Sequence, residues 1–401
     1  MTSPAFHPKA YDLVLVFTAF QRNCVYASVI KELAGRYRIA VLPVDRDETT
    51  SSRIGNTNRL FLDLCSSLGA DILGDDPVTA RIAVLAQSNY RKEDIARIDA
   101  MVEAGRTFWM SGVAMGNGSY ANLFGKKVDR ILVPDRRLYD HRVAAYGNDG
   151  IEFPEHVIQE IGIPYRKYPL FDSPIDADYI LANPTPFSFV TAQDRLDYLE
   201  NVHAMAREIA ARGEVIAFKP HNADERADYI VDARLLSLVS AAPLRPFQGA
   251  IDGAARASAR LLPEGKAREF AVNISIAVVY RKLMALVVRL SELTPYHNLN
   301  LEVFLPGVRK GLITGRSNSI WHALFLKKTV WNCIDEDKPY FSDTKMHKYA
   351  MTYLGVHGNH RDRGFDPARY DVIAESTRSA DLIRFLDGEL AAVSQKTTVE
   401  A

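Results

Sequence analysis

The sequence predicts an α/β protein made of two Rossmann-like, doubly wound domains that face each other across a cleft. Three observations predict it. Short apolar runs alternate with amphipathic segments in the first half, a proline-rich stretch interrupts this alternation, and the alternation then restarts. Apolar runs of this length are typical of strands buried on both faces of a parallel sheet. The length of 401 residues suits two domains of ordinary size.

In the first half, the expected strands and helices follow one another regularly. Each expected helix is followed by a glycine (Gly35, Gly69 or Gly105), a residue that often ends helices. Repeated strand–helix units imply a parallel sheet with helices on both faces. We expect strands at residues 13–17, 39–44, 82–86, 107–110 and 130–133, and helices at residues 24–33, 58–68 and 92–104.

The domain boundary is expected at Pro164, Pro169 and Pro174, because closely spaced prolines favour an extended connector. We therefore expect domains at residues 1–172 and 173–401. The second domain includes a closing helix at residues 379–394. Its other elements are expected as strands at residues 178–182, 215–218, 311–314 and 329–333, and helices at residues 191–212 and 318–326.

Residues 267–293 do not fit this alternation and predict a long helix rich in apolar residues. Arg281, Lys282 and Arg289 form a basic edge along it. The segment is either a packed helix of the second domain, the commoner role of such a helix, or a contact with a membrane surface or another subunit.

Composition excludes several classes of function. The 49 basic and 49 acidic residues balance, whereas a nucleic-acid binder usually has a basic excess. The three cysteines are far apart and indicate neither a disulfide framework nor a zinc site. We find no signal-peptide pattern and no apolar run of membrane-spanning length. These features predict a cytoplasmic protein, at most peripheral on the inner membrane, and we expect no cofactor.

The first candidate site follows the expected strand at residues 215–218. Ligands of open α/β sheets bind at the carboxyl ends of strands, and Lys219 and His221 would lie there. A cation and an imidazole can neutralise a phosphate leaving group. The alternative is a polar loop without a role.

A second candidate follows the expected strand at residues 311–314. There Arg316, Ser317 and Ser319 surround a turn into a helix, where free N–H groups and the helix dipole favour phosphate. Ordinary helix capping is the alternative. We expect His221 and Ser317 to face each other across adjacent strand ends. Asp335, after the next strand, would accept hydrogen bonds from a sugar or lie in a solvated turn.

Two further candidates lie in the first domain. Asp149, in an Asn-Asp-Gly sequence, is either a turn residue or a general base on a loop that faces the cleft. Gln21, Arg22 and Asn23 follow the first strand, in a loop that commonly lines the cleft. We expect no metal, because Lys219, His221 and Arg316 would neutralise the charge instead.

These motifs together resemble GT-B glycosyltransferases, particularly the bacterial CMP-sugar sialyl- and polysialyltransferases and, more distantly, the CDP-glycerol glycerophosphotransferases. Residues 219–222 (KPHN) are similar to a Lys-Pro-His-Pro motif of that superfamily. Residues 300–302 (NLE) stand for its Pro-Leu-Glu segment, and residues 315–319 (GRSNS) for its Gly-x-x-Ser-Ser turn. Residues 148–150 (NDG) resemble the acidic motif that carries the base of the sialyltransferases. The segment at residues 109–112 lacks the histidine of the polymerases.

The resemblance implies a metal-independent glycosyltransferase. A CMP- or CDP-activated sugar or polyol would bind the second domain, and a cell-surface glycan or lipid-linked glycan the first. Asp149 would deprotonate the acceptor hydroxyl. The alternatives are a nucleotide-sugar epimerase of the same fold and a degenerate relative that binds a nucleotide or glycan without turnover. Membrane contact and self-association both stay open.

Overall fold

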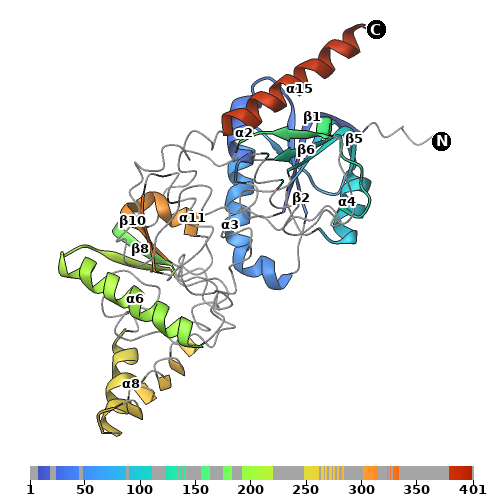
Figure 1. Ribbon diagram of the computed structural model, residues 1–401. Helices are drawn as coiled ribbons and strands as arrows, with labels where there is room; N and C mark the ends of the chain where they lie inside the picture. The colour runs from blue at the N-terminus through green and yellow to red at the C-terminus, as the bar shows by residue number, and fades with distance from the viewer. Residues whose placement is uncertain are drawn as a thin grey trace. The chain divides into compact units, whose positions relative to one another are not determined.

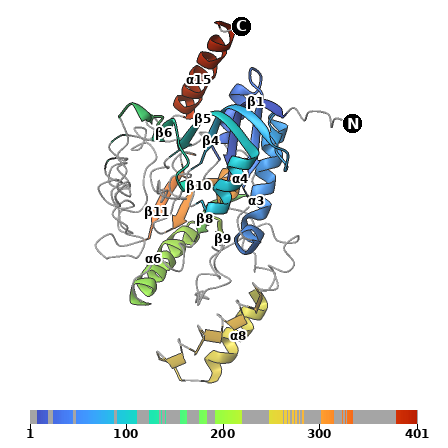
Figure 2. The ribbon, with the colours of Figure 1, turned by 90° about the vertical axis from the view of Figure 1, so that its right-hand side faces the viewer.

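The computed structural model describes two compact units. The first unit comprises residues 1–166, 345–350 and 372–401, and the second comprises residues 167–344 and 351–371. Figures 1 and 2 show their elements from two sides. The described residues are 8–18, 24–44, 48–86, 90–110, 123–133, 155–162, 175–182, 192–219, 248–261, 301–314, 328–333 and 379–399, with isolated positions in 136–140, 263–283 and 323–326.

Within the described residues, the first unit contains a seven-stranded sheet in which every pair of neighbouring strands is parallel. The strand order is β3-β2-β1-β4-β5-β6-β7. The strands are β1 (Lys9–Phe17), β2 (Ile39–Pro43), β3 (Asp71–Ile72), β4 (Val78–Leu85), β5 (Val102–Met110), β6 (Arg130–Val133) and β7 (Ile158–Glu160). From β1 the chain moves first to β2 on one side and later to β4 on the other. The strand order therefore reverses between β1 and β4, which makes this the switch point of the sheet.

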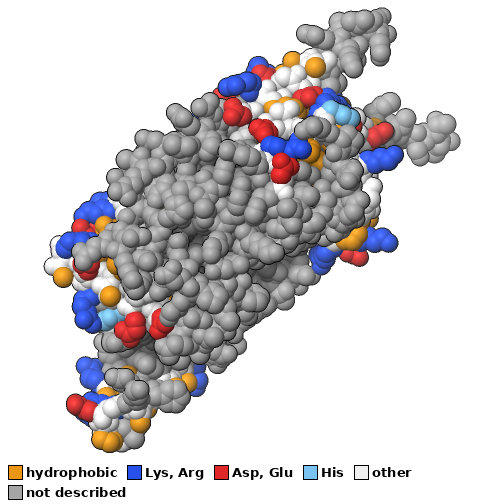
Figure 3. Space-filling view, in the orientation of Figure 1, with side chains coloured by type: hydrophobic (Ala, Val, Ile, Leu, Met, Phe, Trp, Pro, Cys, Tyr) orange, Lys and Arg blue, Asp and Glu red, His pale blue; other side chains and the backbone are white. Residues whose placement is uncertain are grey.

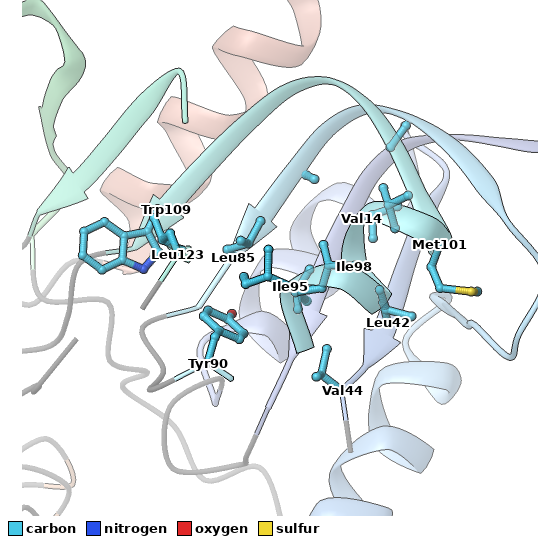
Figure 4. Packing of buried hydrophobic residues seen from close by; sticks show 14 of the residues in the cluster. Val14, Leu42, Val44, Leu85, Tyr90, Ile95, Ile98, Met101, Trp109 and Leu123 are labelled. Atoms are coloured by element: carbon cyan, nitrogen blue, oxygen red, sulfur yellow. The ribbon is translucent and has the colours of Figure 1, made fainter. Parts of the chain in front are cut away.

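Helices cover both faces of this sheet, as a doubly wound fold requires. Val14 and Trp109 belong to one buried cluster with Ile95 and Ile98 of α4 (Lys92–Met101), and Figure 4 shows side chains of this cluster between the strands and α4. Phe108 points to the opposite face, since neighbouring residues of a strand alternate. There its ring lies 5.5 Å from that of Phe385. The predicted α/β fold is confirmed for this unit. Its other described helices include α2 (Tyr26–Leu33) and α3 (Glu48–Ser67).

The start of β5 differs from the prediction. The sequence places a helix at residues 92–104 with Gly105 as its end, but α4 ends at Met101 and β5 begins at Val102. Val102 pairs with Val78 of β4, so ladder hydrogen bonds replace the last helical turn. Gly105 serves the strand, because a Cβ there would lie 3.2 Å from the Arg81 carbonyl oxygen.

Within the described residues, the second unit contains a four-stranded parallel sheet of order β11-β10-β8-β9. Its strands are β8 (Ala177–Ala182), β9 (Ile216–Lys219), β10 (Val308–Thr314) and β11 (Thr329–Asn332). Gly311 lets β10 and β11 approach closely, since a Cβ there would lie 2.2 Å from the Thr329 carbonyl oxygen. A second parallel sheet confirms the two-sheet α/β prediction. The described helices of this unit include α6 (Ala192–Ala211), α8 (Gln248–Leu261) and α11 (Leu301–Phe304).

The C-terminal helix α15 (Ser379–Val399) packs on the first unit, whereas the sequence analysis assigns it to the second domain. It lies beside α2 in Figure 1. Arg36 and Tyr37 both bond to Asp387, the tyrosine hydroxyl at 2.9 Å. Arg106 pairs with Glu389. The amphipathic pattern of α15 predicts a helix with a buried face but does not say which sheet will bury it.

The first strand of each sheet carries the same polar arrangement. In β1, the Asp12 carboxylate accepts the N–H of Arg38 at 2.8 Å and a hydrogen bond from Arg81 of β4 at 2.7 Å. In β8, the Asp178 carboxylate accepts the N–H of Val215 at 2.8 Å and a hydrogen bond from Arg309 of β10 at 3.0 Å. Each aspartate therefore joins its own strand to the strands on both sides.

Candidate functional site

Lys219, Ala182 and Thr314 form a row at the carboxyl edge of the second sheet. Lys219 pairs with Ala182 in the register of β9 and β8. Leu181 of β8 pairs with Ile313 of β10, so the next residues, Ala182 and Thr314, lie opposite each other. Paired residues of parallel strands share a sheet face. Lys219 and Thr314 are therefore polar residues on one face, separated by the methyl group of Ala182.

Lys219 is the last residue of β9, one position further into the sheet than the sequence predicts. Its side chain is buried, with only 3% of the residue exposed. A buried ammonium group at a strand end is suited to an anionic ligand, because a low local dielectric strengthens its attraction for negative charge. Of the predicted catalytic and binding residues, Lys219 is the one that lies within the described part of the chain.

Thr314 fixes the geometry at the end of β10. It is fully buried, and its hydroxyl donates a hydrogen bond of 2.8 Å to the Ala182 carbonyl oxygen. This bond ties β10 to β8 at their carboxyl ends. Thr314 was not a candidate in the sequence analysis, although it is the last residue before the predicted Gly315-to-Ser319 turn.

The strand order of the second sheet reverses between β8 and β10. From β8 the chain goes to β9 on one side and later to β10 on the other. In open α/β sheets, ligands bind at such a switch point, beyond the carboxyl ends of the two strands. The segment that carries Arg316, Ser317 and Ser319 begins there, directly after Thr314. These three residues lie outside the described residues.

The strands that precede His221 and Ser317 are not neighbours. The sequence predicts that the two residues follow adjacent strand ends, but β8 lies between β9 and β10. Two strand spacings separate the ends of β9 and β10 by about 10 Å. The predicted adjacency of these two strands is wrong, because strand order cannot be read from the local sequence. His221 and Asp335 lie outside the described residues.

The connection after β8 was not among the candidate sites predicted from the sequence. Residues 183–191 (NPTPFSFVT) connect Ala182 to the start of α6, so this loop also begins at the switch point. Their placement lies outside the described residues. The signal was present in the sequence, because a predicted strand at residues 178–182 runs directly into Asn183 and Pro184.

The end of β11 is held by α6. The Asn201 side-chain amide donates to the Cys333 carbonyl oxygen at 3.2 Å.

Burial raises the pKa of the Cys333 thiol, and it raises the pKa of the Cys65 thiol to about 12. Thiols that stay protonated are poor nucleophiles. These two cysteines therefore pack as apolar residues, and Asp335 would follow two positions after Cys333.

The switch point of the first sheet lies between β1 and β4. The Tyr26 hydroxyl is within hydrogen-bonding distance of the carbonyl oxygens of Val16, at 3.1 Å, and Val84, at 3.4 Å. Its buried ring thus bridges the carboxyl ends of the two strands. The predicted acceptor-side residues Gln21, Arg22 and Asn23 belong to the connection from β1 to α2, but they and Asp149 lie outside the described residues.

The most perturbed carboxylate among the described groups lies away from these edges. Hydrogen bonds from Arg309 and from the Val215 N–H lower the pKa of Asp178 to about 2. Asp178 is the second residue of β8, so it lies at the amino end of the sheet. Lys310 and Arg212 both pair with Glu214 beside it. Because ligands of open α/β sheets bind at the opposite edge, we assign this charged cluster to stability rather than catalysis.

We expect Asp178→Asn to destabilise the second unit by about 1 to 2 kcal/mol at neutral pH. The native pKa is below the unfolded value, so the carboxylate stabilises the fold above about pH 4 and loses this effect as pH falls through about 2. Urea midpoints measured from neutral to acid pH check this. Asp176→Asn is the control, since Asp176 also pairs with Arg309 but is exposed. Equal, pH-independent losses in both variants would contradict the assignment.

The described residues contain no group of three or more histidines, cysteines and acids that could hold a metal ion. Within the same part of the chain, no helix combines the length and the apolar character needed to cross a bilayer.

Comparison with known proteins gives structural likenesses alone. No protein-family model and no curated protein sequence matches the chain. A UDP-GlcNAc 2-epimerase of Methanocaldococcus jannaschii, solved with UDP-GlcNAc and UDP, is similar at a TM-score of 0.41 and 8% identity, over 94% of this chain and 92% of that one. The wall teichoic acid polymerase TagF is similar at 0.38 and 12%, over 96% and 90%. Neither likeness assigns an activity, so the function has to be argued from the residues of this chain.

Proposed function

We propose that the protein is a metal-independent glycosyltransferase that uses a nucleotide-activated donor. The observation that carries the proposal is the row of Lys219, Ala182 and Thr314 at the carboxyl edge of the second sheet. The buried cation Lys219 lies on β9, next to the switch point between β8 and β10. Arg316, Ser317 and Ser319 follow the end of β10 in the sequence.

A departing nucleotide needs its phosphate charge neutralised as the bond to the sugar breaks. Lys219 supplies one positive charge from the end of β9. Arg316 would supply a second, and the Ser317 and Ser319 hydroxyls would donate hydrogen bonds. His221, two residues after Lys219, would stabilise the same developing charge. Asp335, after β11, would bind the sugar or the ribose.

The acceptor would be a glycan or lipid-linked glycan bound by the first unit. Gln21, Arg22 and Asn23 follow β1 at the switch point of that sheet. A hydroxyl becomes a competent nucleophile only when a base removes its proton as the new bond forms. Asp149 would be this base. CMP or CDP is the donor nucleotide that the motif resemblance favours.

A thermal-shift series with CMP, CDP, UDP, GDP and dTDP tests donor binding. At about 100 times its dissociation constant, a ligand that binds only the native state stabilises it by about 2.7 kcal/mol. We expect the cytidine nucleotides to raise the melting temperature most. A null result with all five would contradict the proposal.

Release of free nucleotide then tests the reaction. We expect a nucleotide-activated sugar to release its nucleotide faster when a glycan acceptor is added. Conversion of the sugar without an acceptor would indicate an epimerase instead. Nucleotide binding without release or conversion would indicate a binding protein.

A further inference from the structure

A helical hairpin in the second unit exposes large aliphatic side chains. It consists of α8 and the helical residues between 267 and 283, and we call it the 248–283 hairpin. Its two parts contact each other through the Ser258 and Ser275 hydroxyls, 2.5 Å apart. The hairpin extends beyond α6 at one end of the unit (Figure 1).

Leu261, Ile274 and Val278 of the hairpin are 80%, 42% and 51% exposed. Ile274 and Val278 lie four residues apart, so they share one side of their helix, and Lys282 continues the same line. Side chains of this size are normally buried, and exposed groups of them mark contact surfaces. Hydrophobic and basic side chains lie close together at this end of the unit (Figure 3).

The charge of the hairpin selects the kind of partner. Residues 248–283 hold six basic and three acidic side chains, in a chain whose total charge is balanced. Arg256, Arg260 and Lys282 are exposed. Among the described side chains of the hairpin, the acidic one is Glu264, which pairs with Arg268 at 3.4 Å. Aliphatic groups bordered by exposed basic groups complement an anionic lipid surface, whereas a second copy of the same face would repel it.

We propose that the 248–283 hairpin docks the protein on anionic membranes by lying in the bilayer interface. Leu261, Ile274 and Val278 enter the boundary between headgroups and acyl chains. Arg256, Arg260 and Lys282 stay at the level of the lipid phosphates. This docking uses none of the residues proposed for donor binding, so it stands or falls separately from the transfer reaction.

Co-sedimentation with vesicles tests the apolar contact. We expect the full chain to bind vesicles of phosphatidylcholine mixed with phosphatidylglycerol, and to bind pure phosphatidylcholine far more weakly. The double variant Ile274→Glu, Val278→Glu should lose this binding. Leu60→Glu is the matched control, because Leu60 is a helical leucine of the first unit with a similar exposure of 40%. It should bind as the unchanged protein does.

A second set of variants tests the charge contribution. Each of Arg256→Gln, Arg260→Gln and Lys282→Gln should weaken binding to the anionic vesicles by about fivefold, and added salt should weaken it further. The far-ultraviolet circular dichroism of every variant should match that of the unchanged protein. Equal vesicle binding by the double variant and the unchanged protein would overturn the proposal. So would a vesicle-independent dimer that the double variant dissociates, because a second copy would then cover this face.

Discussion

Lys219→Met should lower the transfer rate by about 10²- to 10³-fold and remove most of the nucleotide-dependent stabilisation. Methionine keeps the length and apolar character of the side chain in its buried position but removes the ammonium group. The fold should therefore survive, while the phosphate loses a cation in a site where low dielectric makes that charge effective. Initial rates of transfer and thermal shifts with CMP and CDP measure the two effects.

Lys310→Met is the matched control. Lys310 lies near the amino end of the same sheet and pairs with Glu214, so the same charge is removed at the edge opposite the proposed site. Its transfer rate and nucleotide response should stay close to those of the unchanged protein. Equal rates in the Lys219 and Lys310 variants would exclude Lys219 from the donor site.

Asp149→Asn should reduce transfer by about 10²- to 10⁴-fold while leaving nucleotide binding nearly unchanged. Asparagine has almost the same size as aspartate, but it cannot accept the acceptor proton. The donor nucleotide is proposed to bind the other unit, so its affinity should not depend on this carboxylate. Transfer rates and nucleotide thermal shifts on this one variant separate the two steps.

If residues 148–150 form only a turn, asparagine will serve equally well, since it is a favourable turn residue. The variant would then transfer at the normal rate, and the enzyme would need another base. Asp140→Asn is the control for removing an acid from the same region. Asp140 pairs with Arg136 at 2.8 Å on the surface, a type of contact that contributes about 0 to 1 kcal/mol.

The strands that were predicted well are those whose residues are buried on both faces. The apolar runs within β1 and β8 mark them, because a parallel sheet covered by helices requires such runs. The first part of β5 was missed, since Glu103, Gly105 and Arg106 have no strand-like pattern. Pairing with β4 makes these residues a strand, and this partner is distant in sequence.

The position of Lys219 at a strand end could be predicted from the sequence. A cation follows an apolar run there, and the structure puts it at the carboxyl edge of the sheet. The separation of β9 from β10 by β8 was not predictable from local sequence, since strand order depends on how the crossovers pack. The assignment of α15 failed for a related reason. Its partners, Arg36 and Arg106, lie more than 280 positions away in the chain.

Asp12 and Asp178 lie at equivalent positions of the two sheets and indicate an internal repeat. The Arg38 carbonyl oxygen accepts the N–H groups of residues 12 and 13, and the Val215 carbonyl oxygen accepts those of residues 178 and 179. Backbone and side-chain bonds therefore match in both halves, and they give a pseudo-symmetric correspondence between the units. Under it, the connection that follows β1 corresponds to the connection that follows β8, residues 183–191. On the proposed function, residues 183–191 would then lie beside the donor as Gln21, Arg22 and Asn23 would lie beside the acceptor.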